Sequence, residues 1–422
     1  MGPFHIEAYL GRFATAVVLS MPKLCLGQIC FYMVRPGGIE PPKASNRLAP
    51  TLLFLQTARA LPICLRSPLY YILILLACQA VYFRFFAIEF GKYLCNFLLG
   101  ASMKTTVLNW VLAHEPYHVF IKAAKNFANE VFEETKGAYQ INVIDLTEWN
   151  RLADQNLTTL TTDREKIIGL VNNGSIDMAT VYANTLGAID KDMYALSMPF
   201  LFREHEEAQR TIDGALGQHM LAKIADKSNI RGLAFTYSGG FRIVPSKFAI
   251  EKLEDFYKQN IGCGNNPVSM GTFNSVGATP VPMFIEDLAK GLQDQKVVGG
   301  ETTYTRYFIL GHNEQTSYIN DNEHSLFLTS LIINNQLWKS MSEETQQIFA
   351  KAALAAAHIE RQESLADNVT VQAQAALQGI PTVKMSAKER GRFESATKGM
   401  YTDLSTYFSA GLLDQLQKGL KH

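Results

Sequence analysis

The first regular pattern of hydrophobic and polar residues begins at Thr105. Thr105–Ala113 is rich in β-branched and aromatic residues and predicts a strand. Apolar residues at helical spacing follow over 117–136, and Gly137 ends that helix. The patterns then predict a strand over 139–144, a helix over 163–172 and a strand over 176–182. This alternation predicts a parallel α/β sheet, whose ligand sites lie beyond the carboxyl ends of the strands.

A second set of α/β elements follows from residue 196 onward. We expect helices over 204–212, 216–225 and 284–291, and strands over 231–237, around 243, 268, 279 and 297, and over 326–334. Ser342 then caps a long helix, with Glu343 and Glu344 placed favourably against its N-terminal dipole. The alanine-rich run over 349–377 is long enough to cross from one α/β unit to the other.

Residues 1–102 do not show the pattern of a domain. Their hydrophobic runs are interrupted by Pro, Cys and Arg at positions that do not match the residue patterns of turns. Val34–Pro42 resembles a translated transfer-RNA gene region. We expect a spurious N-terminal extension that is disordered or absent from the natural protein. An export signal or membrane anchor over 66–86 stays open, because an apolar run there ends in Leu-Leu-Ala-Cys78.

Charge excludes some classes of partner. Lys plus Arg and Asp plus Glu both total 39, so no net field favours nucleic acid or an anionic membrane. Residues 103–422 hold 30 basic and 36 acidic residues and a single cysteine, Cys263, so packing rather than a disulfide must hold this part together. Between Gly262 and Gly264, Cys263 has no His or cationic partner nearby in sequence, and we expect a small residue in a tight backbone approach rather than a reactive thiol.

His114-Glu-Pro-Tyr-His118 matches the zinc-protease motif H-E-x-x-H. That chemistry requires both histidines on one continuous helix, with the glutamate as general base. Pro116 breaks a running helix but suits the first turn of the helix that follows. We therefore expect His114 and Glu115 to follow a strand and face a cleft, and we expect no bound metal or cofactor.

The stretch Tyr237–Glu301 is the best candidate for function. Gly239 and Gly240 permit backbone angles that other residues resist. Arg242 follows them, and its planar guanidinium can hold a carboxylate through two hydrogen bonds.

The order of several motifs resembles the solute-binding proteins of TRAP (tripartite ATP-independent periplasmic) transporters, a DctP-like family. The likeness begins near Val107 and covers the rest of the chain. It rests on Leu112-Ala-His-Glu-Pro, Asn173-Gly-Ser-Ile-Asp177, Leu196-Ser-Met-Pro-Phe-Leu-Phe202, Gly240-Phe-Arg242, Val276-Gly-Ala-Thr-Pro-Val-Pro-Met283 and Val298-Gly-Gly-Glu301.

The resemblance implies a two-lobed α/β fold, like that of periplasmic binding proteins, with a hinge and a long C-terminal helix that spans both lobes. We place the first lobe at 103–239 plus about 328–367, and the second at about 240–327 plus 368–422. Closure around a small organic anion is then stabilised by the ligand. The ligand-binding residues we expect are Arg242, His114, Glu115, Tyr182, Asn265, Glu301, Thr302 and Tyr237.

The chain departs from the family pattern at the site. A second arginine that the family uses falls at Gly262 here, and Thr302 replaces the asparagine that follows the glutamate. Tyr182 stands where the family often has an acidic or polar residue. Either Arg242 holds the carboxylate alone, or Arg306 or Asn265 substitutes, or the ligand is not a carboxylate.

We therefore expect a periplasmic, monomeric receptor that delivers a small organic acid to TRAP permease subunits in the membrane and catalyses no reaction. Two alternatives remain open at this point. One is a zinc-dependent hydrolase that uses His114, Glu115 and His118. The other is a ligand sensor on the same fold.

Overall fold

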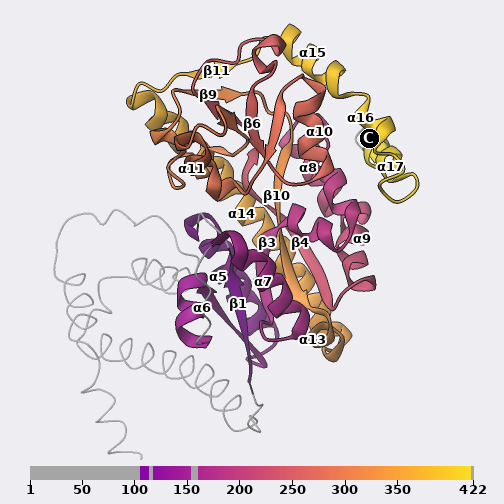
Figure 1. Ribbon diagram of the computed structural model, residues 1–422. Helices are drawn as coiled ribbons and strands as arrows, with labels where there is room; N and C mark the ends of the chain where they lie inside the picture. Colours follow the sequence, from indigo (N-terminus) through magenta and orange to yellow (C-terminus); the bar gives the residue numbers. More distant parts are fainter. Residues whose placement is uncertain (1–104, 114–116, 154–159, 420–422) are drawn as a thin grey trace, which may run out of the picture. The chain divides into compact units, whose positions relative to one another are not determined.

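The computed structural model describes residues 105–113, 117–153 and 160–419. Within them the chain forms two sheets, each with its own helices (Figure 1). The extension expected over 1–102 and the signal or anchor considered at 66–86 lie outside the described residues. In the part of the chain that is described, no helix is both long and apolar enough to cross a membrane.

The first sheet has five strands in the order β2-β1-β3-β10-β4. Their bounds are Thr106–Leu112 (β1), Tyr139–Asp145 (β2), Met178–Tyr182 (β3), Ile230–Phe241 (β4) and Leu326–Asn334 (β10). β1 pairs in parallel with β2 and β3, as the sequence pattern predicts. β10 runs antiparallel to β3 and to β4, so a late segment of the chain completes the middle of this sheet.

Helices cover both faces of the first sheet, and we call this unit the first lobe. Alternation along β1 assigns the faces: Trp110 packs toward α5 and α14, whereas Val111 packs toward the helices on the other face. The helices are α5 (Tyr117–Glu134), α6 (Leu146–Ala153), α7 (Leu160–Asn173), η2 (Ala183–Ala188), η3 (Lys191–Ser197), α8 (His205–Asp213), α9 (Ala215–Lys223), η4 (Ile224–Asp226) and α13 (Asn335–Ser340).

The second sheet has six short strands in the order β11-β9-β5-β8-β6-β7, and we call its unit the second lobe. The strands are β5 (Val244–Ser246), β6 (Asn260–Cys263), β7 (Thr279–Pro282), β8 (Gly299–Gly300), β9 (Tyr318–Asp321) and β11 (Thr382–Lys384). The helices between them are η5 (Leu253–Phe256), α10 (Pro267–Ser275), η6 (Ile285–Asp287), α11 (Leu288–Gln293), α12 (Tyr304–Tyr307) and η7 (His312–Glu314). Three more helices end the described chain: α15 (Ala387–Thr397), α16 (Met400–Asp403) and α17 (Leu412–Gly419).

The strand expected around Val268 is a helix in the structure. Asn266 accepts hydrogen bonds from the backbone N–H groups of Val268 and Ser269, at 3.1 and 2.9 Å, and so caps α10. Pro267 occupies the first turn, where its missing N–H costs nothing. These two residues start a helix, and the strand of this region is β6, which ends at Cys263.

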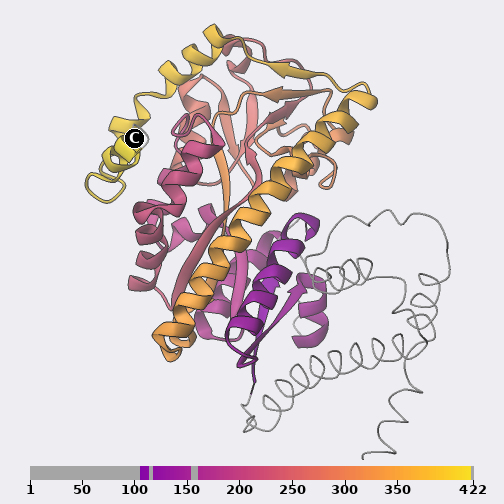
Figure 2. The ribbon, with the colours of Figure 1, turned by 180° about the vertical axis from the view of Figure 1, so that it is seen from behind.

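Helix α14 (Glu343–Leu377) spans both lobes, as predicted (Figure 2). It packs on β4 and α5 of the first lobe and on α12 and β11 of the second. Ser342 caps it by accepting the N–H of Thr345 at 3.2 Å.

Three side chains of α14, one helical turn apart, bond the backbone of β4 where that strand leaves the first sheet. Glu360 accepts the N–H of Tyr237 at 2.6 Å, Ser364 Oγ accepts the N–H of Gly239 at 3.0 Å, and Asn368 donates to the carbonyl of Gly239 at 2.7 Å. These bonds supply partners where the pairing of β4 with β10 is interrupted by a β-bulge. The register of the two strands shifts between Phe327 and Leu328, and Gly239 has a φ of 91°. The lobe boundaries that we placed near 239, 327 and 367 stay predictions.

Candidate functional site

Arg242 lies where the chain passes from β4 to β5, and its side chain is 5% exposed. Its backbone N–H donates to the carbonyl of Ser325 at 2.9 Å, which joins the segment between β4 and β5 to the residue just before β10. The guanidinium carbon lies 4.2 Å from the centre of the Phe327 ring. The backbone hydrogen bond and the Phe327 ring thus fix the position of Arg242, while the N–H donors of its guanidinium remain free of hydrogen bonds to the described residues and can bind a ligand.

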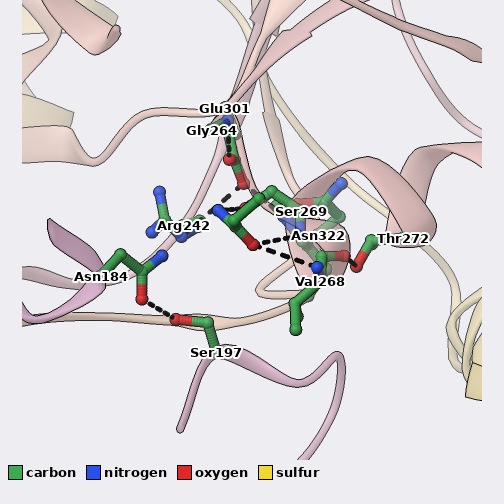
Figure 3. A network of polar contacts seen from close by, with 11 residues as sticks. Asn184, Ser197, Arg242, Gly264, Val268, Ser269, Thr272, Glu301 and Asn322 are labelled. Atoms are coloured by element: carbon green, nitrogen blue, oxygen red, sulfur yellow. Dashed lines mark hydrogen bonds and ion pairs between the residues drawn. The ribbon is translucent and has the colours of Figure 1, made fainter. Parts of the chain in front are cut away.

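Glu301 forms an ion pair with Arg242, with Oε2 3.7 Å from Nε (Figure 3). Its Oε1 accepts the N–H of Gly264 at 2.8 Å, and Oε2 lies 3.4 Å from Nε2 of His324. Burial by itself raises the pKa of Glu301, but Arg242, His324 and the Gly264 N–H together lower it to about 2. Glu301 is therefore an ionised carboxylate that partly neutralises Arg242.

The guanidinium of Arg242 makes no hydrogen bond to any residue that the structure describes, and its buried Nε has no partner within hydrogen-bonding distance. Burial lowers the pKa of Arg242, and Glu301 opposes that effect. Arginine keeps its charge even in proteins, so a cation with unused donors faces the site.

Arg306 is a second buried guanidinium at the same place, and the predicted site residues do not include it. Its carbon lies 4.6 Å from the centre of the Phe327 ring, so Arg242 and Arg306 contact one aromatic side chain. It donates to the Tyr182 hydroxyl at 3.1 Å, to the Ser238 carbonyl at 2.8 Å and to Thr303 Oγ1 at 3.2 Å. From the sequence, Arg306 is only a substitute donor for the carboxylate, because nothing in its local pattern marks it as buried.

The structure explains how the chain accommodates Gly262 in place of an arginine. A Cβ added at this glycine would lie 2.7 Å from Sδ of Met283 and 3.1 Å from Cδ1 of Leu288. The first distance is shorter than real Cβ atoms show and the second is tight, so the Met283 side chain would have to shift within a densely packed interior. Apolar side chains thus occupy the room that a side chain at 262 would need.

The other predicted site residues lie in different surroundings. Tyr182 contacts Phe327 edge-on, with 4.9 Å between ring centroids, and its hydroxyl donates to Glu286 Oε1 at 3.0 Å. Thr302 is fully buried, and its backbone pairs with Ile243. Asn265 is exposed in the loop between β6 and α10. His114 and Glu115 lie outside the described residues.

Tyr237 lies in the hydrophobic core of the first lobe. It is fully buried, with its ring 5.3 Å from that of His205. Burial raises its pKa, and its hydroxyl donates to the His205 carbonyl at 3.4 Å. Its backbone N–H, by contrast, takes part in the contact with α14 described above.

Amide and hydroxyl groups add to the polar surroundings drawn in Figure 3. Ser197 donates to Asn184 at 2.8 Å within the first lobe. Asn322 of the second lobe is buried, and its side-chain oxygen lies 3.0 Å from Nδ1 of His324. The site therefore combines guanidinium, carboxylate and amide groups, which suits a small polar anion.

The metal alternative receives no support from the residues that can be described. His118 lies in the first turn of α5, exposed, with Nε2 3.1 Å from Asp367 of α14. No group of three His, Cys, Asp or Glu side chains there is placed to hold a metal ion. Cys263 is buried, and burial raises the pKa of its thiol, with Glu301 adding to the effect.

Known proteins are similar to this chain in sequence and in fold. The model of bacterial extracellular solute-binding protein family 7, DctP, matches residues 112–406. The 2,3-diketo-L-gulonate-binding periplasmic protein YiaO of Escherichia coli K12 is 25% identical over 240 residues, which are 57% of this chain and 69% of that protein.

Two crystal structures of TRAP periplasmic solute-binding proteins have the same fold. One, from Ochrobactrum anthropi with its C-terminus in the ligand-binding pocket, has a TM-score of 0.66 and 22% identity, and covers 76% of this chain and 96% of that one. The other, from Xanthobacter autotrophicus Py2 with bound β-D-galacturonate, has a TM-score of 0.64 and 23% identity, and covers 74% and 99%. This chain belongs to the DctP family of TRAP solute-binding proteins, bacterial extracellular solute-binding protein family 7, whose members bind solutes and are not enzymes.

Proposed function

We propose that this protein captures a small organic acid between its two lobes and delivers it to the membrane subunits of a TRAP permease from the periplasmic side. The ligand's carboxylate binds the guanidinium of Arg242, and closure of the lobes buries the pair. YiaO, which binds 2,3-diketo-L-gulonate, and the galacturonate-bound receptor both take sugar acids, which favours a carboxylate that carries hydroxyl groups.

The observation that carries this proposal is the state of Arg242. Its side chain is 5% exposed, yet its guanidinium makes no hydrogen bond within the described residues. An unsatisfied buried charged group is costly, so native structures keep one where a partner will supply the missing bonds. A carboxylate matches the fork of the guanidinium and supplies two acceptors.

The neighbouring charges favour a single carboxylate at this point. Glu301 is ionised and lies 3.7 Å from Arg242, so it already supplies one negative charge. Gly262 contributes no second guanidinium, and Met283 and Leu288 fill the space beside it. A second carboxylate placed near Arg242 would meet Glu301, and the other guanidinium nearby, Arg306, already donates to Tyr182, Ser238 and Thr303.

Arg242→Ala tests the proposal. We expect it to weaken binding of galacturonate or 2,3-diketo-L-gulonate by about ten- to hundred-fold, since one charged hydrogen-bonded pair contributes ~1.5–3 kcal/mol. Isothermal titration calorimetry on wild type and variant measures the change. Arg392→Ala is the matched control, because Arg392 is half-exposed on α15 and pairs with Glu254 and Glu389 away from this site. Equal affinity of Arg242→Ala and wild type for an acid that binds would remove Arg242 from the site.

Delivery to the permease needs its own measurement. Liposomes that contain a TRAP permease, with the receptor and labelled acid outside, should accumulate the label. Receptor that binds the acid but supports no uptake with any TRAP permease tested would contradict the transport role and favour a sensor.

A further inference from the structure

Tyr182 connects the two lobes through its hydroxyl group. It is the last residue of β3 and so belongs to the first lobe. Its hydroxyl donates to Glu286 Oε1 at 3.0 Å and accepts from Arg306 Nε at 3.1 Å. Glu286 lies in η6 and Arg306 in α12, and both elements belong to the second lobe.

The ring of Tyr182 is fixed independently of its hydroxyl. Phe327 packs against it edge-on at 4.9 Å, and the guanidinium carbon of Arg306 lies 4.9 Å from its centre. The whole side chain is buried. A phenylalanine in its place would keep these ring contacts and lose the bonds of the hydroxyl to Glu286 and Arg306, so the substitution tests the hydroxyl.

The second-lobe partners are also held in place. His312 is fully buried, and burial lowers its pKa to about 4, so the imidazole is neutral at physiological pH. Its Nε2 lies 3.1 Å from the carbonyl of Ile285, and because a carbonyl can only accept, Nε2 carries the proton and donates it. This bond holds Ile285, the neighbour of Glu286 in η6. Helix α7 of the first lobe also packs against η6.

We propose that Tyr182 is a positioning residue that latches the lobes in the closed arrangement, by bonding Glu286 and Arg306 across the gap between them. The inference rests on the proposed function, because it assumes that the lobes open and close around a ligand. It assigns Tyr182 a role besides ligand contact: the hydroxyl makes closed molecules common before any ligand arrives. Both partners carry charged functional groups, and hydrogen bonds to charged groups are stronger than neutral ones.

The lobe separation of the unliganded full-length protein tests the latch without any ligand. Ketone-bearing residues replace Lys125 on α5 and Asn274 on α10, both exposed, and take nitroxide labels without using cysteines. Double electron–electron resonance then gives the distribution of distances between the two labels. In wild type we expect the short distance to dominate. In Tyr182→Phe we expect the ratio of short to long distances to fall ~10-fold or more, as the loss of two charged hydrogen bonds requires.

Tyr307→Phe is the matched control. Its hydroxyl is also buried, but it bonds Thr316 at 3.0 Å inside the second lobe, so we expect a wild-type distribution. Glu286→Gln supplies a second variant if Tyr182→Phe folds poorly, and it should also lengthen the distances because it removes the charge that the hydroxyl bonds. A distribution in Tyr182→Phe and Glu286→Gln that equals wild type, or a wild type that is wholly open, overturns the latch. These results do not depend on Arg242 or on any acid, so they leave the carboxylate proposal to its own test.

Discussion

Glu360 should make the protein less stable as pH rises through neutrality. The carboxyl group is 1% exposed in the middle of α14. Burial raises its pKa from the usual 4.5 to about 8, although the Tyr237 N–H, Thr236, Arg361 and Ser364 act in the opposite direction. At neutral pH the folded protein therefore keeps a proton on Glu360 that the unfolded chain has lost.

The sign and size of the effect follow from these two values. Below pH 4.5 both states are protonated and the pH has no effect through this group. Between 4.5 and 8 only the unfolded chain releases the proton, so the free energy of unfolding falls by about 1.36 kcal/mol per pH unit. Above pH 8 both states are ionised and the loss is complete, at about 5 kcal/mol. Stability from this group is thus greatest in acid and is lost as pH rises to about 8.

Glu360→Gln removes the titration and keeps an oxygen that can accept the Tyr237 N–H. We expect the variant to match wild type near pH 5 and to exceed it by several kcal/mol at pH 8, up to the ~5 kcal/mol above. Guanidinium unfolding, followed by tryptophan fluorescence at pH 5, 6.5 and 8, measures the difference. Glu344→Gln is the control, because Glu344 is exposed on the first turn of the same helix and should leave the pH dependence unchanged. A difference between Glu360→Gln and wild type that stays constant across this range would show that Glu360 does not titrate as argued.

Two further substitutions test the packing of the second lobe. Gly262→Ala should lower the free energy of unfolding by ~1–3 kcal/mol, because its Cβ would meet Met283 at 2.7 Å, and adding Met283→Ala should recover part of the loss; no change in melting temperature would refute the contact. Asn266→Ala should cost ~1 kcal/mol through loss of the α10 cap, whereas Asn274→Ala, exposed near the end of the same helix, should cost less, and equal losses would argue against capping.

Local patterns predicted the elements whose signals are local. The alternation of strands and helices over 105–182 and the alanine-rich α14 follow from hydrophobic period and propensity, which act over a few residues. The strand expected around Val268 is wrong because Asn266 and Pro267 form a helix start, a signal present in the sequence but outweighed by the apolar residues that follow.

The candidate site is built from contacts between residues far apart in the chain, and these contacts cannot be predicted from local sequence patterns. Arg242 stands out because it follows two glycines, but Arg306 reaches the same Phe327 ring from 64 positions farther along the chain, with no motif to mark it. The same holds for Tyr182 and Glu286, which are 104 positions apart. Such contacts form only when the two sheets have formed. The sequence therefore suggests several candidate partners for Arg242 and Tyr182 but does not show which of them lie close.

The central place of β10 in the first sheet has a consequence for synthesis. β1, β2 and β3 are complete by residue 182 and β4 by residue 241, but β10, which joins β3 to β4, ends at Asn334. A nascent chain that has emerged only to residue 300 therefore carries β1, β2 and β3 on one side and β4 on the other, without the strand that joins them and without the cover of α14. The first lobe begins first in the chain but closes its core only after β10 is made, so we expect its apolar surfaces to stay uncovered through most of the chain's elongation.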